Sequence, residues 1–262
     1  MDKNIYTYYR LFGWSILAII FAFLIDNILM VGFQFPGILS LTNGFSLFPS
    51  IELVIYVFSL CLVFYFIPKY KNQSLRNDSK FLHNLNIYII RSCFWIIFLI
   101  GIVDISIAFL RVEKIFDLFL TKNITAQFTR PVFVGTYIHI PLIIFGFILG
   151  LFTRTLGFHW LSLLIVLSEL VIVITRFIFS YEQTFMGDLV RYWYAGLFLF
   201  ASAYTLYDEG HVRVDILYQG LKDRTKGLVN SIGSITLGVS TSLTIIFICL
   251  LYTSPSPRDK CR

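Results

Sequence analysis

Residues 86–109 read NIYIIRSCFWIIFLIGIVDISIAF and contain only two charged side chains, Arg91 and Asp104. A helix needs about 20 mainly apolar residues to cross the hydrocarbon core of a bilayer, which is about 30 Å thick. This stretch is both long enough and apolar enough to do so. It therefore predicts a transmembrane helix.

Six further apolar runs, which are also candidates for membrane spans, occur in the rest of the chain. Of its 262 residues, 57% are hydrophobic and 14% are charged, and the mean hydropathy is +0.79. In soluble domains about 25% of residues are charged. We expect an all-α, polytopic transmembrane helical bundle of about seven spans with a short interfacial helix. The six further runs are 11–33, 50–67, 132–152, 158–180, 189–207 and 228–252.

The first apolar run follows the polar sequence MDKNIYTYYR. The run is longer than the core of a signal peptide and is not followed by a small-residue cleavage site. We therefore expect it to remain in the protein as an uncleaved first span.

Basic residues between the runs predict the orientation of the chain. The loop at 34–49 has no Lys or Arg, whereas 68–84 holds four basic residues. The positive-inside rule therefore places 68–84 and the N-terminus in the cytoplasm. The net charge of +6 follows from this topology and gives no support to nucleic acid as a partner. Apolar residues recur at helical spacing in 110–131 and 214–221, which predicts surface helices outside and inside the membrane, respectively.

Several ionisable side chains lie within the apolar runs, where each costs about 2.5 to 3.5 kcal/mol near a helix centre. Glu169 and Arg176 are seven residues apart and project from nearly the same helical face. One hypothesis is an ion or proton relay. The other, which we favour, is an interhelical salt bridge that includes Arg191. For Asp26 and Asp104 we expect a shared polar contact between the first and third helices.

The sequence contains no nucleotide-binding loop, zinc-protease motif or serine-hydrolase motif. The spacing of its cysteines does not match a metal site. Its longest polar loops are too short to build a catalytic domain. We therefore expect that the protein is not an enzyme, and we assign no catalytic, cofactor-binding or metal-ligating residues.

The most distinctive polar segment is EGHVRVDILY, residues 209–218, directly after the sixth run. Its glycine permits a sharp turn, and its histidine can donate to a carbonyl. Its arginine and aspartate can pair or bind neighbouring backbone groups. A generic basic loop would not need this order of residues. The residues concerned are Glu209, Gly210, His211, Arg213 and Asp215.

The run from 175 to 218 resembles the small permease subunit of tripartite ATP-independent periplasmic (TRAP) transporters, the DctQ-like family. In that family an Arg-aromatic pair closes one helix, and an acidic-x-x-Arg-aromatic element opens the next. A Gly-His-Val-Arg-Val-Asp motif follows. The resemblance covers about 158–252. Here the elements are Arg176-Phe177, Asp188 with Arg191-Tyr192, and Gly210 to Asp215.

The resemblance divides the chain into three parts. Residues 1–154 form an N-terminal four-helix transmembrane region of unknown role. Residues 155–252 form the small-permease-like region, with three of the four helices that the family has. Residues 253–262, TSPSPRDKCR, resemble translated sequencing-adaptor read-through. We expect a non-native tail there, and a natural chain that continues into a fourth helix.

The resemblance also implies a structural role and a set of partners. In such systems a periplasmic solute-binding protein captures an organic anion, and a large permease carries it across the membrane with sodium. The small subunit braces the large permease, so sodium is expected in that partner and no cofactor is expected here. The chain would be a multi-pass protein of the bacterial inner membrane. The residues expected to anchor it to its partner and to the lipid surface are Arg176, Asp188, Arg191, Glu209, Gly210, His211, Arg213 and Asp215.

The favoured function is therefore a scaffold subunit in the sodium-coupled uptake of an organic anion such as a carboxylate. The alternative is an autonomous ion or solute carrier or channel that uses the intramembrane acids Asp26, Asp104 and Glu169. A scaffold requires a large permease, whereas an autonomous carrier does not. A third hypothesis, an intramembrane enzyme or redox subunit, would require a bound chromophore or metal.

Overall fold

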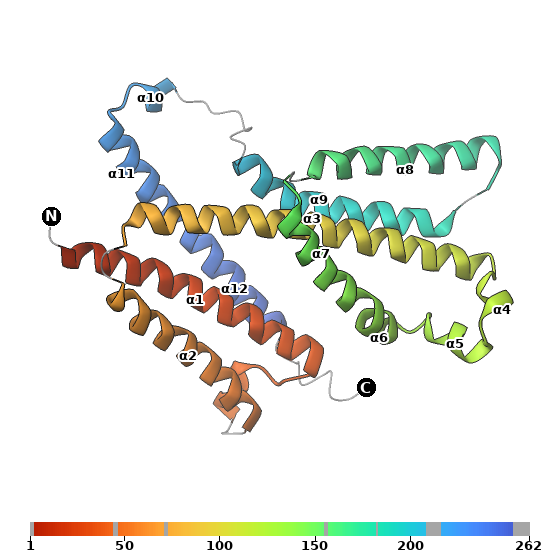
Figure 1. Cartoon of the computed structure of the whole chain (residues 1–262), viewed down its shortest axis with the longest axis horizontal. Helices are drawn as coiled ribbons and strands as arrows, with labels where there is room; N and C mark the ends of the chain where they lie inside the picture. The colour runs from red at the N-terminus through yellow and green to blue at the C-terminus, as the bar shows by residue number, and fades with distance from the viewer. Residues whose placement is uncertain are drawn as a thin grey trace. The chain divides into compact units, whose positions relative to one another are not determined.

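The computed structural model describes residues 3–43, 47–70, 73–154, 157–181, 183–207 and 216–253, and these residues form helices and short connections without a strand (Figure 1). The helices are α1 (Lys3–Phe33), the 3-10 helix η1 (Ile38–Asn43), α2 (Leu47–Lys69), α3 (Leu75–Val112), α4 (Phe116–Phe119), α5 (Lys122–Gln127), α6 (Pro131–Val134), the π-helical segment η2 (Gly135–His139), α7 (Ile140–Phe152), α8 (Phe158–Ile178), α9 (Thr184–Tyr207), α10 (Ile216–Gln219), α11 (Asp223–Gly233), the π-helical segment η3 (Ser234–Val239) and α12 (Ser240–Thr253).

Six helical stretches among the described residues are long and apolar enough to cross a membrane, which confirms the predicted all-α polytopic fold. They correspond to six of the seven predicted runs. The remaining run, 189–207, lies inside α9, a helix of 24 residues. Asp188, Arg191 and several tyrosines lower the hydropathy of this helix. The six stretches are Tyr6–Met30, Leu47–Lys69, Leu75–Val112, Pro131–Phe152, Phe158–Ile178 and Asp223–Ile248.

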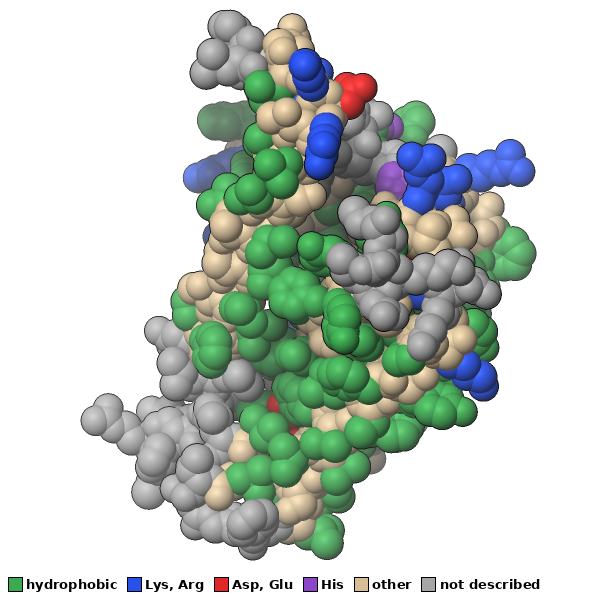
Figure 2. Space-filling model, turned by 90° about the vertical axis from the view of Figure 1, so that its left-hand side faces the viewer, with side chains coloured by type: hydrophobic (Ala, Val, Ile, Leu, Met, Phe, Trp, Pro, Cys, Tyr) green, Lys and Arg blue, Asp and Glu red, His purple; other side chains and the backbone are tan. Residues whose placement is uncertain are grey.

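Many apolar side chains lie on the outside of these helices. On α1, Phe21, Leu24 and Ile28 are 61%, 55% and 63% exposed. Hydrophobic side chains also cover much of the face shown in Figure 2, with Lys and Arg mainly toward its upper end. A water-soluble protein of this size would not expose such an extensive apolar surface. Lipid is the solvent that fits it.

The chain packs as two compact units, residues 1–78 with 214–262 and residues 79–213. These units do not coincide with the division at residue 154 that the sequence suggests. That division was based on a family resemblance, whereas the units reflect contacts between helices. The division at residue 154 therefore remains a prediction.

In the first unit, α1 and α2 form a hairpin, and a buried ion pair joins α1 to the first turn of α3. Arg10 is 3% exposed, and its Nε lies 2.6 Å from Oδ2 of Asp78. Arg10 also donates to the carbonyl of Tyr70 (2.8 Å), and the indole of Trp14 donates to Asp78 (3.1 Å). The beginning of α1 and the basic 68–84 segment thus lie at the same end of this unit. This agrees with the prediction that both lie on one side of the membrane.

Replacing Arg10 by Met should lower the free energy of unfolding by about 3 kcal/mol, because it leaves the buried Asp78 carboxylate without its counter-charge. The double variant Arg10→Met with Asp78→Leu should be less destabilised than Arg10→Met alone, since it removes both charges. Denaturation in mixed detergent micelles measures these differences. Arg191→Met is the control, because the Arg191 side chain is 86% exposed. If Arg10→Met lowered the free energy of unfolding no more than Arg191→Met does, the stabilising role of the Arg10–Asp78 pair would be contradicted.

In the second unit, α3, α8 and α9 share a hydrophobic core. Its residues recur at helical spacing on each element. Trp193 of α9 is 2% exposed, and its indole donates to the carbonyl of Ile97 on α3 at 3.3 Å. A Cβ atom added at Gly101 would overlap this indole, so the glycine makes room for it. The core residues are Ile90, Phe94, Ile97, Phe158, Leu161, Ile165, Leu189, Val190 and Trp193.

Two glycines one turn apart bring α7 close to α3 within the same unit. A Cβ at Gly146 would lie 3.0 Å from the backbone nitrogen of Ile96, and one at Gly150 would lie 3.1 Å from that of Ser92. Small residues at this spacing let helix backbones approach each other in lipid. The indole of Trp95 donates to Thr153 at 3.0 Å and fastens the same pair of helices.

The predicted amphipathic helix over 110–131 is not a single helix. The segment contains two short helices, α4 and α5, and Lys114 has a positive φ of 56° just before them. A non-glycine residue in this conformation ends a helix. The interfacial helix predicted at 214–221 is represented by the four-residue helix α10.

Candidate functional site

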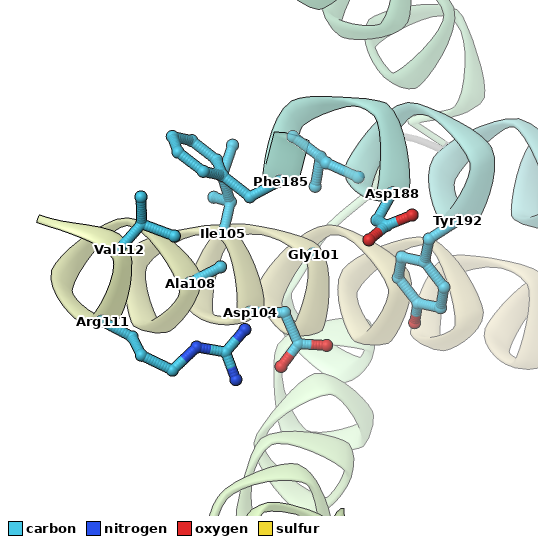
Figure 3. A pocket seen from close by; sticks show the side chains of 10 residues that line it. Gly101, Asp104, Ile105, Ala108, Arg111, Val112, Phe185, Asp188 and Tyr192 are labelled. Carbon is cyan, nitrogen blue, oxygen red and sulfur yellow. The ribbon is translucent and has the colours of Figure 1, made fainter. Parts of the chain in front are cut away.

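A pocket of about 410 Å³ lies in the second unit between the C-terminal part of α3 and the N-terminal part of α9. Figure 3 shows Asp104 and Arg111 projecting from α3, and Asp188 and Tyr192 projecting from α9. The lining positions recur at intervals of three or four, so one face of each helix lines the pocket. The remaining lining residues are Gly101, Ile105, Ala108, Val112, Phe185 and Leu189.

Asp104 has a partner on a third helical element. Nε2 of His139, the last residue of the π-helical segment η2, lies 2.7 Å from Oδ1 of Asp104. The two side chains are 29% and 44% exposed, respectively. A π-helical turn shifts the side chains that follow it, and such turns occur frequently at functional sites. The contact is an ion pair when His139 is protonated and a hydrogen bond when it is neutral.

Charges of both signs meet at this pocket. The Arg111 side chain extends along α3 toward Asp104 (Figure 3). Asp188 is paired on its own helix with Arg191, at 3.8 Å, and both side chains are more than 80% exposed. Such a pair contributes about 0 to 1 kcal/mol. Asp188 is therefore available to another partner, and the pocket can bind a polar group by hydrogen bonds and charge.

A hydrogen bond joins the connection between α8 and α9 to the residue that follows α3. The hydroxyl of Tyr181 donates to Oε1 of Glu113 at 3.1 Å. This hydrogen bond, with some desolvation and the charge of Glu113, raises the pKa of the Tyr181 phenol. The phenol therefore keeps its proton, and stays a donor, to higher pH than a free tyrosine would.

Residues 165–256 match the family model described as "Tripartite ATP-independent periplasmic transporters, DctQ component". Residues 165–256 are DctQ-like. No curated protein and no solved structure matches the chain at a significant level. The match includes most of α8 together with α9, α10, α11 and α12, whereas α1 to α7 precede it.

The DctQ-like region does not pack only with itself. Its first two helices, α8 and α9, share their core with α3, which lies outside the family match. Phe94 of α3 packs edge-on against Phe158 of α8, and Phe98 stacks on Trp193 of α9. The N-terminal region therefore supplies a helix to the core of the second unit.

Of the predicted anchoring residues, the structure describes Arg176, Asp188 and Arg191, and all three side chains are exposed. Asp188 lines the pocket, and the Arg191 side chain pairs with Asp188. The other predicted residues, Glu209, Gly210, His211, Arg213 and Asp215, lie outside the described residues.

The structure shows a partner for two of the intramembrane acids. Asp26 accepts a hydrogen bond from Tyr56 of α2, and Asp104 contacts His139. The expected contact between the first and third helices stays a prediction. Each acid meets a neighbour within its own unit. Glu169 is exposed on α8 and has no hydrogen bond or ion pair with the described residues.

Sequence reasoning missed several polar residues that these contacts involve. Arg111 lines the pocket, and His139 contacts the pocket residue Asp104. Neither was predicted as a site residue: Arg111 lies in the predicted loop 110–131, and His139 lies within the predicted run 132–152. Glu52 is the third residue of the predicted run 50–67, and Tyr56 follows one turn later on the same face. The spacing of Glu52 and Tyr56 was the signal that could have identified a polar face on this helix.

Among the described residues, no group of three or more His, Cys, Asp or Glu side chains could hold a metal ion. The pocket offers an acid paired with a histidine, a guanidinium and a phenol, which are groups that can bind a polar or charged partner. A DctQ-type protein is a component of a transporter.

Proposed function

We propose that this chain is the small membrane subunit of a TRAP-type secondary transporter and takes part in the sodium-coupled uptake of an organic anion such as a carboxylate. The match of residues 165–256 to the DctQ family carries this proposal. A large permease binds sodium and the solute, and a periplasmic solute-binding protein delivers the solute. The small subunit sits in the bacterial inner membrane with its N-terminus in the cytoplasm and braces the large permease.

The outer face of α8 supports the proposal that the chain has a membrane partner. Val166, Leu170 and Val173 are 61%, 51% and 48% exposed, and Glu169 is exposed among them. A carboxylate near the middle of a span costs about 2.5 to 3.5 kcal/mol unless a donor meets it. A helix of a larger permease with a basic or amide side chain would meet that need.

A double substitution tests the proposal. Arg213→Ala with Asp215→Ala should reduce both assembly with the large permease and solute uptake by about tenfold, which corresponds to about 1.4 kcal/mol. The reason is that, in this proposal, these two charges lie at the membrane surface and anchor the subunit. Radiolabelled solute uptake and co-purification measure the effect, and protease protection measures insertion of the chain.

The control for this experiment is Asp223→Ala with Arg224→Ala, which removes the same two charge types from exposed positions on α11. It should leave uptake and assembly unchanged. Normal uptake and assembly in the Arg213 and Asp215 variant would contradict the proposed anchoring role.

A further inference from the structure

The hairpin of α1 and α2 encloses two acidic side chains that the proposed function does not use. Asp26 and Glu52 are both 0% exposed. Tyr56, one turn after Glu52, donates to Oδ2 of Asp26 at 3.3 Å, and the backbone N–H of Gly37 donates to Oε1 of Glu52 at 3.1 Å. The second oxygen of each group, Oδ1 of Asp26 and Oε2 of Glu52, is buried without a hydrogen-bond partner among the described residues.

Nothing in this part of the chain balances the two acids. Between Arg10 and Lys69 the sequence has no Lys, Arg or His, and Asp26 and Glu52 are its only acids. Arg10 is already engaged with Asp78. The neighbouring elements η1 and α12 contain no charged residue within their described bounds. Tyr56 contacts Asp26 and lies one turn after Glu52 on the same face of α2, so the two acids occupy the same side of the hairpin. No basic side chain between Arg10 and Lys69 offsets their charge.

Buried carboxylates are stable only when they are paired, hydrogen-bonded or bound to a cation. In membrane proteins, an ionisable residue inside a span is a candidate site for an ion or proton. Cations in transporters are often held by carboxylates together with the backbone of a non-helical segment. Such a segment is present here, because residues 34–37 are non-helical and Gly37 contacts Glu52.

We propose that Asp26 and Glu52 form a binding site for one small monovalent cation, a proton or Na⁺, that bridges Oδ1 of Asp26 and Oε2 of Glu52. The shared chemistry is one positive charge between two carboxylate groups. The site belongs to the hairpin alone and does not depend on the proposed transporter role.

Thermal unfolding of the full chain in lipid nanodiscs tests the site. Na⁺ binding would raise the melting temperature in NaCl above that in choline chloride by about 5 °C at saturation. Proton binding would instead lower the melting temperature in both salts as the pH rises from about 5 to about 9. The double variant Asp26→Asn with Glu52→Gln should lose whichever response the natural chain shows. Asp117→Asn, which changes an exposed acid on α4 in the other unit, should keep it.

Carbodiimide labelling of the unsubstituted chain gives a second readout that does not depend on a variant folding. The reagent attacks protonated carboxyl groups in apolar surroundings, and peptide mapping by mass spectrometry locates it. Labelling of Asp26 or Glu52 that Na⁺ suppresses supports a sodium site. Labelling that follows pH and ignores Na⁺ supports a proton site. Melting and labelling that respond to neither cation would overturn the proposal.

Discussion

Replacing Trp193 by alanine should lower the free energy of unfolding by about 3 to 5 kcal/mol. The side chain is 2% exposed, stacks on Phe98 and donates its indole N–H to the carbonyl of Ile97. Its loss would leave a large cavity where α3 meets α9. Unfolding in mixed detergent micelles, followed by circular dichroism, measures the change.

Two further variants separate packing from hydrogen bonding at this position. Trp193→Phe keeps most of the ring and should cost less than Trp193→Ala, with about 1 kcal/mol due to the lost hydrogen bond. Trp160→Ala is the matched control, because Trp160 lies on the adjacent helix α8 and is 60% exposed. If Trp160→Ala lowered the free energy of unfolding as much as Trp193→Ala, the special role of the buried Trp193 in this core would be contradicted.

Gly150→Leu should destabilise the chain by about 3 kcal/mol, because the larger side chain would push α7 away from α3. Even a Cβ atom at this position would lie 3.1 Å from the backbone nitrogen and Cα of Ser92. The same unfolding measurement applies. Gly13→Leu is the control, since a Cβ added at Gly13 of α1 meets nothing within 4 Å. Equal stability of the two variants would contradict close packing of α3 and α7.

The spans could be predicted from the sequence because the hydropathy of a segment is a local property. Apolar length alone identified six of the helices that the structure contains. The helix α9 was also predicted, although its hydropathy falls below that of the others, because the run 189–207 is bounded by polar residues. The family was predicted from residues that the family match includes, such as Arg176 and Asp188.

The contacts of the polar residues could not be predicted in the same way. Within their own units, Asp26 contacts Tyr56 and Asp104 contacts His139, and neither partner was predicted. Which helix faces an acid depends on how the helices pack, and hydropathy holds no information about that. The Gly146 and Gly150 pair could be predicted in part. Its spacing in the sequence is typical of close helix packing, but the sequence does not show that α3 is the helix it packs against.

The central claim is that this chain braces a larger permease, and co-purification tests it most directly. The natural full-length protein would be isolated from its own membranes in mild detergent, and mass spectrometry would identify what accompanies it. The account predicts recovery of a large, multi-span TRAP permease in a stable complex. Recovery of the chain alone, together with solute transport by that isolated chain in proteoliposomes, would contradict the account and favour an autonomous carrier.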